Sequence, residues 1–420
     1  MISADSLKLR RQRFAALFDS PVVLWSGRSL SRNFPANTFP FRASSHFLYF
    51  AGLPIENAAI RLEAGTLALF MDEASPASAL WHGEMPSRAE VAAQIGADAA
   101  YPLERLKHFT EETATIAASD PVTRLEQSRL LNRMITPANA PQGMDLALSR
   151  AIVALRLIQD EAALNEIRAA IAVTIKAHKA GIAATMQAKT ESQIRAAMES
   201  VILSHNMTCA YNSIVTVHGE VLHNEHYHHQ VRSQDLVLAD VGAETSSGWA
   251  SDLTRTWSAS GKCSPTQRAI YEVVLAAHDV AIAQIHPEIE YRDVHLLACC
   301  TLAEGLIDLG ILKGHPADLV EMDAHTLFFP HGIGHLLGLD VHDMEDLGDL
   351  AGYEAGRSRS SRFGLGYLRL DRPLREGMVV TIEPGFYQVP AILNDPERRE
   401  NYRDVVNWDR LAEFSDVLQP

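Results

Sequence analysis

The segment 235–259 constrains the fold of this chain most strongly, because it places two acidic side chains in an apolar hairpin. "DLVLADVG" is an apolar run interrupted by Asp240, and "SDLTRTWSA" is rich in β-branched and aromatic residues. Turn-forming residues at 245–248 lie between them, so the segment predicts two antiparallel strands. Because a buried carboxylate without a partner is costly, we expect Asp240 to be paired, protonated or bound to a metal ion.

A second carboxylate, that of Asp252, lies across the predicted turn from Asp240. Opposed residues of an antiparallel pair project from the same face of a sheet, so the two carboxylates are expected to converge. Two like charges so close need a cation between them. The alternative is that Asp240 forms an ion pair with Arg255 while Asp252 caps the turn, and these two residues alone favour neither interpretation.

Two later segments carry further side chains of the same kind. Glu383 is a lone acid in the β-branched run "GMVVTIEPGFY", and "FPHGIGHLLGLDVHD" contains His331, His335 and His342. A lone histidine is usually a core or surface residue, but three histidines together with three acids in apolar strands favour a metal site. Oxygen-rich ligands with one imidazole suit Mn²⁺, with Co²⁺ and Zn²⁺ as substitutes, and bridging carboxylates suit a two-metal hydrolase.

Length and charge limit the class of protein. A chain of 420 residues is expected to form two domains. Its formal net charge of −15, without a dense basic run, argues against nucleic acid and membrane as partners. Residues 1–19 lack the apolar core of a signal peptide, and no apolar stretch is long enough to span a bilayer, so we expect a cytoplasmic protein.

The four cysteines have no spacing typical of a zinc cluster. Cys299 and Cys300 lie in "DVHLLACCTLAEGLIDLG", whose apolar residues recur at helical spacing. Free cysteine behaves as a small hydrophobic residue, so we expect the two thiols to pack in the core rather than to act in catalysis.

The order of predicted elements indicates two domains. The first 150 or so residues alternate helical and strand-like pieces, as in an α/β unit, and the segment 144–186 then predicts one helix of about forty residues. A fresh amphipathic pattern begins near Arg156, so we place the domains at 1–155 and 156–420. Thr190 with Gln193, and Ser264 with Gln267, predict two further helix starts.

Three of these motifs resemble the prolidase, aminopeptidase P and methionine aminopeptidase family, whose catalytic domain has the pita-bread fold. They are "ADVGAETSSGWASDLTRTW", "PHGIGHLLGLDVHD" and "TIEPGFY". In addition, "SSHFLYFAGLP" resembles the creatinase-type N-terminal domain, which favours the proline-specific branch. The implied fold class is α/β (α+β): a creatinase-like N-terminal α/β domain followed by a pita-bread catalytic domain that is short at its C-terminal end.

The resemblance also implies an activity and a set of site residues. The activity is metal-dependent hydrolysis of the peptide bond preceding proline, in a peptide or dipeptide with proline at the second position, by a homodimer that uses up to two divalent ions. The implied metal ligands are Asp240, Asp252, His335 and Glu383. Glu383 also takes a proton from water, His223 stabilises the oxyanion, His342 contacts the substrate near the scissile bond, and His331 shapes the substrate pocket. His226, His228 and His229 match no family residue and are expected to be solvated.

The chain departs from the family pattern at two places. The spacing from Asp240 to Asp252 is one residue longer than usual, which an extra residue in the turn accommodates. The family also carries a fifth ligand, a glutamate in an "R-I-E-D"-like strand, whereas this chain ends in "WDRLAEFSDVLQP", where Glu413 and Asp416 lie near but outside such a motif. We therefore expect two, one or no bound ions and impaired hydrolysis. The alternatives are a catalytically inactive pita-bread protein that binds protein partners and a metal-independent relative like creatinase.

Overall fold

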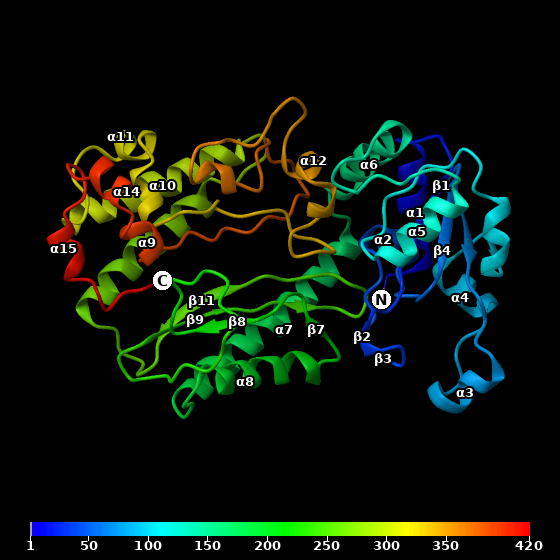
Figure 1. Ribbon diagram of the computed structural model, residues 1–420, viewed down its shortest axis with the longest axis horizontal. Helices are drawn as coiled ribbons and strands as arrows, with labels where there is room; N and C mark the ends of the chain where they lie inside the picture. Colours follow the sequence, from blue (N-terminus) through cyan, green and yellow to red (C-terminus); the bar gives the residue numbers. More distant parts are fainter. Residues whose placement is uncertain (1) are drawn as a thin grey trace. The chain divides into compact units, whose positions relative to one another are not determined.

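The computed structural model describes residues 2–420 and consists of two compact units (Figure 1). The first unit holds the residues up to Glu166 together with Ser246–Trp249 and Met344–Ala351. The second unit holds Ile167–Thr245, Ala250–Asp343 and Gly352–Pro420. The domain limits predicted from the sequence, 1–155 and 156–420, are not tested by this division and remain predictions. None of the described helices combines the length and the apolar composition that crossing a bilayer requires.

The first unit is built on a four-stranded sheet with the strand order β1–β4–β5–β6. Its strands are β1 (Val22–Trp25), β4 (Ala59–Glu63), β5 (Thr66–Phe70) and β6 (Ala99–Tyr101), and a separate hairpin is formed by β2 (Ser31–Phe34) and β3 (Asn37–Thr38). The β4–β5 turn is made by Ala64 and Gly65, both at positive φ, which matches the twist of an antiparallel hairpin. Only β6 runs parallel to its neighbour, β5.

The first unit also contains helices. They are α1 (Ala4–Ala15), α2 (Ser45–Ala51), α3 (Pro76–His82), α4 (Arg88–Ile95), η1 (Leu103–His108), α5 (Pro121–Leu130), α6 (Gly143–Arg156), η3 (Glu345–Leu347) and α12 (Asp349–Gly352). The buried guanidinium of Arg10 donates to both carboxylate oxygens of Asp160, at 2.7 and 2.9 Å, and lies 4.4 Å from the centre of the Tyr49 ring. This charge pair ties α1 to the chain that follows α6.

The prediction of one helix through 144–186 was wrong. The helix stops at Arg156, and a new helix, α7 (Glu161–Thr185), begins after Asp160. The Asp160 side chain accepts a hydrogen bond from the Ala163 backbone N–H at 2.8 Å, which is the geometry of an N-cap. Because Arg10 also holds Asp160, the break is fixed by side chains far apart in the sequence, which periodicity alone does not reveal.

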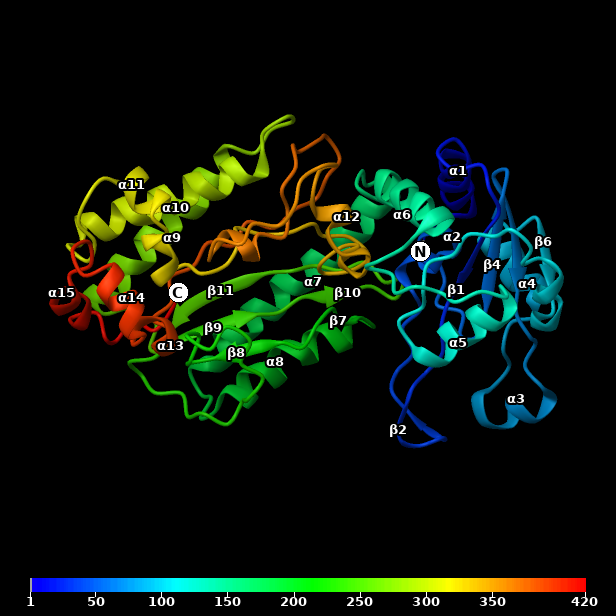
Figure 2. The same ribbon diagram turned by 45° about the horizontal axis from the view of Figure 1, so that its top comes forward.

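The second unit contains a three-stranded antiparallel sheet with the order β11–β9–β8 and a two-stranded pair, β10–β7. The bounds are β7 (Thr208–Cys209), β8 (Ile214–Thr216), β9 (Leu236–Asp240), β10 (Ala243–Glu244) and β11 (Thr254–Ser258). The predicted hairpin at 235–259 is confirmed as β9 and β11. α7 and α8 (Glu191–Ser204) cover one face of the sheet, where Ile194, Met198 and Val237 join one buried apolar cluster (Figure 2).

The remaining elements of the second unit are mostly helical. They are α9 (Pro265–Ala283), α10 (Tyr291–Asp308), α11 (Pro316–Glu321), η2 (Ala324–Leu327), η4 (Leu365–Tyr367), α13 (Pro390–Leu393), α14 (Pro396–Asn401) and α15 (Trp408–Ala412). Both predicted helix starts are present: α9 has the full capping box of Ser264 and Gln267, whereas Thr190 makes no capping hydrogen bond to α8.

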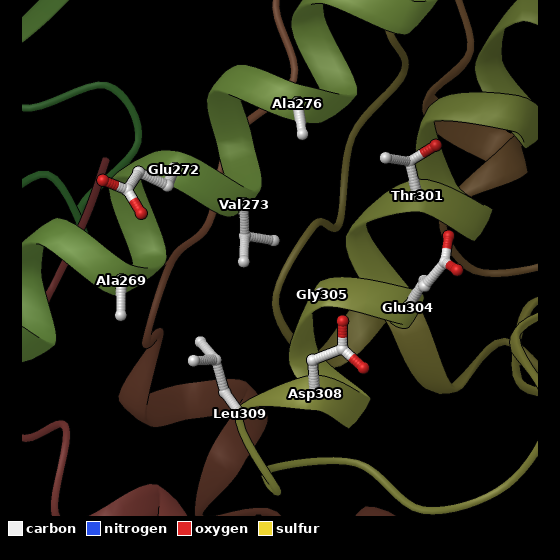
Figure 3. A pocket seen from close by; sticks show the side chains of 9 residues that line it. All are labelled: Ala269, Glu272, Val273, Ala276, Thr301, Glu304, Gly305, Asp308 and Leu309. Carbon is white, nitrogen blue, oxygen red and sulfur yellow. The ribbon is translucent and has the colours of Figure 1, made fainter.

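α9 and α10 approach each other closely at one glycine. A side chain at Gly305 of α10 would lie 2.6 Å from a methyl group of Val273 of α9, so only glycine fits without a shift. Figure 3 shows Val273 pointing into the shallow pocket between the two helices, which Glu272, Glu304 and Asp308 also line.

One ion pair of the first unit gives a test of its stability. Arg133 donates two hydrogen bonds to Asp145, at 2.6 and 2.7 Å, and the buried Asp145 carboxylate also accepts the Thr115 backbone N–H. We expect Asp145→Ala to lower the free energy of unfolding by about 2–3 kcal/mol, because it leaves a guanidinium and a buried N–H without a partner. The measurement is urea unfolding followed by circular dichroism.

The matched control is Glu63→Ala, which removes the exposed carboxylate of the Arg61–Glu63 pair in the same unit. The loss there should stay below about 1 kcal/mol. Equal losses in the two variants would contradict a special role for Asp145.

Candidate metal centre

Asp240 and Asp252 lie together at the end of the β9–β11 ladder. The register pairs Asp240 with Thr254 rather than with Asp252, so the expectation of directly opposed aspartates was wrong. Asp252 precedes Thr254 by two residues, which puts it diagonally across from Asp240 on the same face. The Tyr211 hydroxyl lies 2.5 Å from Asp240 Oδ1 and 2.8 Å from Asp252 Oδ1. One hydroxyl group therefore links the two carboxylates.

The alternative partner for Asp240 was Arg255. In the structure Arg255 is exposed, and its guanidinium donates to the neighbouring Thr254 carbonyl at 2.7 Å. Tyr211 takes the place next to the two acids that the ion-pair interpretation gave to the arginine.

His335 joins Asp252 to Glu383. Its Nε2 lies 3.2 Å from Asp252 Oδ2 and 3.2 Å from Glu383 Oε1. Its Nδ1 lies 3.0 Å from the Leu336 carbonyl, and a hydrogen bond there leaves Nε2 directed at the acids. The four predicted metal ligands thus form one continuous cluster with Tyr211.

Glu383 is positioned by backbone pairing between two irregular segments. The predicted strand around it is not a regular strand, although Val380 bridges Leu336 and the Glu383 N–H donates to the Ile333 carbonyl at 2.8 Å. The Thr381 hydroxyl donates to Glu383 Oε1 at 2.9 Å and accepts the backbone N–H of His335 at 3.0 Å. Thr381 therefore orients both an acid and a histidine of the cluster.

The electrostatics of the cluster call for positive charge. Burial, followed by repulsion from Asp252, raises the pKa of Asp240 well above its usual value. Burial also acts on His335, but hydrogen bonds to Asp252 and Glu383 outweigh it and raise the pKa of the imidazole to about 10. The same bonds, against burial, lower the pKa values of Asp252 and Glu383. Three carboxylates and one imidazole that hold a cationic charge in this way fit a divalent metal ion.

The other predicted histidines lie around this cluster. The rings of His342 and His335 are 4.3 Å apart between centroids. His331 Nε2 lies 3.3 Å from the Tyr387 hydroxyl. His223 is exposed, and it is close enough to lower the pKa of His331, although burial is the main cause of that shift.

One of the three histidines expected to be solvated is only partly so. His226 and His228 are exposed, whereas His229 is half-buried, and its Nδ1 lies 2.9 Å from the carboxylate of Glu191, which is fully buried and also accepts the Val217 N–H. The expectation for His229 therefore holds only in part, because an acid distant in sequence lies beside it.

The two acids near the end of the chain have partners elsewhere. Glu413 pairs with Arg410, and Asp416 accepts hydrogen bonds from Ser264 and Thr266 at the start of α9.

Sequence reasoning missed two polar residues of the cluster, Tyr211 and Thr381. Tyr211 stands in "CAYNSIV" before β8, without an acid or histidine nearby in sequence to draw attention to it. Thr381 stands two residues before Glu383, but it looks like an ordinary β-branched strand residue. Both side chains hydrogen-bond to predicted metal ligands, but neither is of a residue type that suggests a metal ligand from the sequence.

Two family models match this chain, and together they cover most of its length. The family described as metallopeptidase family M24 matches residues 165–410, and the aminopeptidase P N-terminal domain matches residues 7–121. A probable Xaa-Pro aminopeptidase of Fusarium vanettenii is 30% identical over 387 residues, which cover 90% of this chain and 79% of that protein. A protein of the same description from Talaromyces stipitatus is 30% identical over 394 residues, covering 90% and 81%.

Solved structures have the same fold. Aminopeptidase PepP of Pseudomonas aeruginosa has a TM-score of 0.77 at 26% identity, over 94% of this chain and 90% of that chain. Aminopeptidase P from Escherichia coli with the inhibitor Pro-Leu has a TM-score of 0.75 at 24% identity, over 92% and 88%. These matches confirm the predicted α/β (α+β) fold with a creatinase-like N-terminal domain and a pita-bread domain. The chain therefore belongs to metallopeptidase family M24, in its aminopeptidase P branch.

Proposed function

We propose that this protein is a Xaa-Pro aminopeptidase, which hydrolyses the peptide bond between an N-terminal residue and a following proline. The observation that carries the proposal is the partly buried cluster in which His335 contacts Asp252 and Glu383 while Tyr211 links Asp252 to Asp240. Relatives described as probable Xaa-Pro aminopeptidases, matched over 90% of this chain, support the same substrate class. The dipeptidase activity of a prolidase is the nearest variant of this function.

The proposed metal ligands are Asp240, Asp252, His335 and Glu383. An oxygen-rich set with one imidazole favours Mn²⁺, with Co²⁺ and Zn²⁺ as substitutes. A divalent ion bound by these residues supplies Lewis acidity, which activates a water molecule and polarises the scissile carbonyl. Binding requires the neutral imidazole, so the proton that His335 holds between Asp252 and Glu383 must leave.

The side chains of the site have the remaining catalytic roles. The Glu383 carboxylate, held by Thr381, takes the proton of the attacking water at its free oxygen and later returns a proton to the leaving proline nitrogen. We assign oxyanion stabilisation to His223 and substrate contact near the scissile bond to His342. His331 shapes the pocket together with Tyr387. Since the scissile nitrogen belongs to proline, no N–H is present to be held there.

Metal occupancy decides how fast this reaction runs. Among the described residues assigned as ligands, three carboxylates cancel three of the four positive charges that two divalent ions bring. Occupancy by a single ion, with impaired hydrolysis, remains a prediction. A homodimer is likewise part of the proposal, supported by the resemblance to the family. A cytoplasmic location is also proposed, and no described helix is long and apolar enough to cross a membrane.

Hydrolysis of a proline peptide tests the proposed function. With Mn²⁺ present, the full chain should release the first residue of an Ala-Pro-Leu peptide but not of Ala-Ala-Leu, because the pocket accepts an imide nitrogen. Treatment with a chelator should abolish release, and Mn²⁺ should restore it. The measurement is chromatographic quantification of released alanine, with bound metal counted by plasma emission.

Three results would contradict this function. Bound metal without any release from Ala-Pro-Leu would favour an inactive pita-bread protein that binds protein partners. Release that survives exhaustive chelation would favour metal-independent chemistry of the creatinase kind. Release from Ala-Pro but not from Ala-Pro-Leu would replace the aminopeptidase by a dipeptidase.

Removal of one proposed ligand should remove both metal and activity. We expect Asp252→Asn to lower kcat/KM for Ala-Pro-Leu more than about 100-fold. Loss of a residue that only hydrogen-bonds to a metal ligand already lowers metal affinity or activity about 10–100-fold. The number of bound ions should fall in parallel. Glu413→Gln, which changes an acid that pairs with Arg410, is the matched control and should keep metal and activity. A comparable loss in Glu413→Gln would overturn the assignment of ligands.

The Tyr211 hydroxyl should contribute through the carboxylates it holds. Tyr211→Phe removes the donor to Asp240 and Asp252, and we expect metal affinity or kcat to fall about 10–100-fold. Tyr227→Phe is the control, because its hydroxyl donates to the Ser213 carbonyl instead. Isothermal titration with Mn²⁺ and steady-state kinetics measure the two effects, and equal affinities in both variants would refute the role of Tyr211.

A further inference from the structure

A second group of metal-binding side chains lies in the second unit, outside the Asp240 cluster. His295 and Cys299 are one turn apart on α10, and His325 lies in η2. The three residues are buried, with exposed fractions of 0%, 0% and 3%, and one ligand atom from each lies within 4.8 Å of the others. Cys299 Sγ is 3.6 Å from His295 Nε2 and 3.8 Å from its Nδ1.

These side chains are poorly satisfied by the protein itself. Both ring nitrogens of His325 are buried without a hydrogen-bond partner among the described residues. The contact between Cys299 and His295 is a thiol–imidazole hydrogen bond, and a thiol is a weak donor. Buried polar atoms without partners cost folding free energy, so the unpartnered His325 beside a weakly paired thiol and imidazole needs an explanation.

We propose that His295, Cys299 and His325 form a second metal site, which binds a thiol-preferring ion such as Zn²⁺ or Cu⁺. Two imidazoles and one thiolate are ligands that both ions accept, whereas Mn²⁺ prefers oxygen. The binding reaction is balanced by proton release: the sulfur–hydrogen bond breaks, a sulfur–metal bond forms, and the proton passes to solvent.

The geometry requires the imidazole rings to turn. Metal–sulfur and metal–nitrogen bonds of about 2.3 and 2.0–2.1 Å in a tetrahedron give a sulfur–nitrogen separation of roughly 3.6 Å. Cys299 Sγ lies 3.6 Å from His295 Nε2, but it lies almost as close to Nδ1, at 3.8 Å, so the ring must turn to direct Nε2 at a shared ion. The remaining contacts must shorten by about 1 Å from the 4.8 Å limit. The His325 ring interacts with the Leu319 backbone without satisfying either ring nitrogen, so turning it breaks no well-formed hydrogen bond.

The protonation states of the site favour a metal over a proton. Burial lowers the pKa of His295 to about 3 and that of His325 to about 4, so both imidazoles are neutral and their lone pairs are free to bind. Burial raises the pKa of the Cys299 thiol, so its proton is displaced only by a strongly thiol-binding cation. Arg292 acts on His295 and Arg362 on His325, and both disfavour added positive charge, whereas Asp323 favours it. The Cys299 thiolate supplies further compensation.

The site would join α10 to the segment that leads to His331. The Phe329 ring lies 5.8 Å from His295 and 4.7 Å from His331 between ring centroids. An ion held by His295, Cys299 and His325 therefore lies one aromatic ring away from the histidine that we assign to the substrate pocket. A structural role, fixing α10 against η2, follows from this position.

Cobalt substitution tests the site independently of hydrolysis. Because all three side chains are buried, the full chain should be produced in medium supplied with Co²⁺, so that the ion enters as the protein folds. We expect an intense near-ultraviolet thiolate-to-cobalt absorption band, which the Asp240 cluster cannot give because it contains no sulfur. The band should remain in Asp252→Asn, disappear in Cys299→Ser, and remain in Cys300→Ser, the adjacent half-buried thiol.

The native ion is identified by X-ray absorption of protein from cells supplied with both Zn²⁺ and Cu²⁺, the latter reduced to Cu⁺ in the cell. A sulfur scatterer at about 2.3 Å at the zinc edge would assign Zn²⁺, and a sulfur shell at the copper edge would assign Cu⁺. Absence of a thiolate band in the unmodified protein, or an unchanged band in Cys299→Ser, overturns the proposal. If Cys299→Ser does not fold, His325→Gln provides the second variant, and its band should be weakened and shifted.

Discussion

Repulsion among closely spaced, partly buried carboxylates is the constraint on which the metal centre of the second unit depends. Asp240, Asp252 and Glu383 come from a hairpin and from a segment more than a hundred residues away, and they stay together only where positive charge and hydrogen-bond donors lie between them. His335 and Tyr211 provide both. The irregular pairing of 333–337 with 379–383 serves the same requirement, because it brings a histidine and an acid to one hydroxyl, that of Thr381.

Patterns of neighbouring residues were sufficient to predict the elements that depend on neighbouring residues alone. The β9–β11 hairpin follows from alternation and turn residues, and the start of α9 follows from Ser264 and Gln267. The helix break before Asp160 was not predictable in the same way, since it depends on Arg10, which lies about 150 residues away in sequence. The position opposite Asp240 was also not predictable, because the strand pairing places Thr254 there, two residues beyond Asp252.

In the candidate site, too, some residues were predictable from the sequence and others were not. Acids in apolar runs and glycine-flanked histidines mark ligand candidates, because burying such groups is costly without a function. Their supporting residues carry no such mark: Tyr211 and Thr381 are ordinary strand-type residues, and His229 becomes half-buried only because Glu191 lies beside it. A supporting residue is defined by what it contacts, and that information is in the tertiary structure.

The two histidine-containing clusters differ in their ligand atoms, and ligand type decides which metal ions a site prefers. Around Asp240 the donors are oxygen atoms with a single imidazole, and a cation there replaces the proton shared by His335 and its acids. Around Cys299 the donors are sulfur and two neutral imidazoles, with no carboxylate in the group. Since Mn²⁺ prefers oxygen ligands and thiolate prefers softer ions, the proposed Cys299 site would discriminate against Mn²⁺. Phe329, packed between His295 and His331, connects the Cys299 cluster with the histidine that we assign to the substrate pocket.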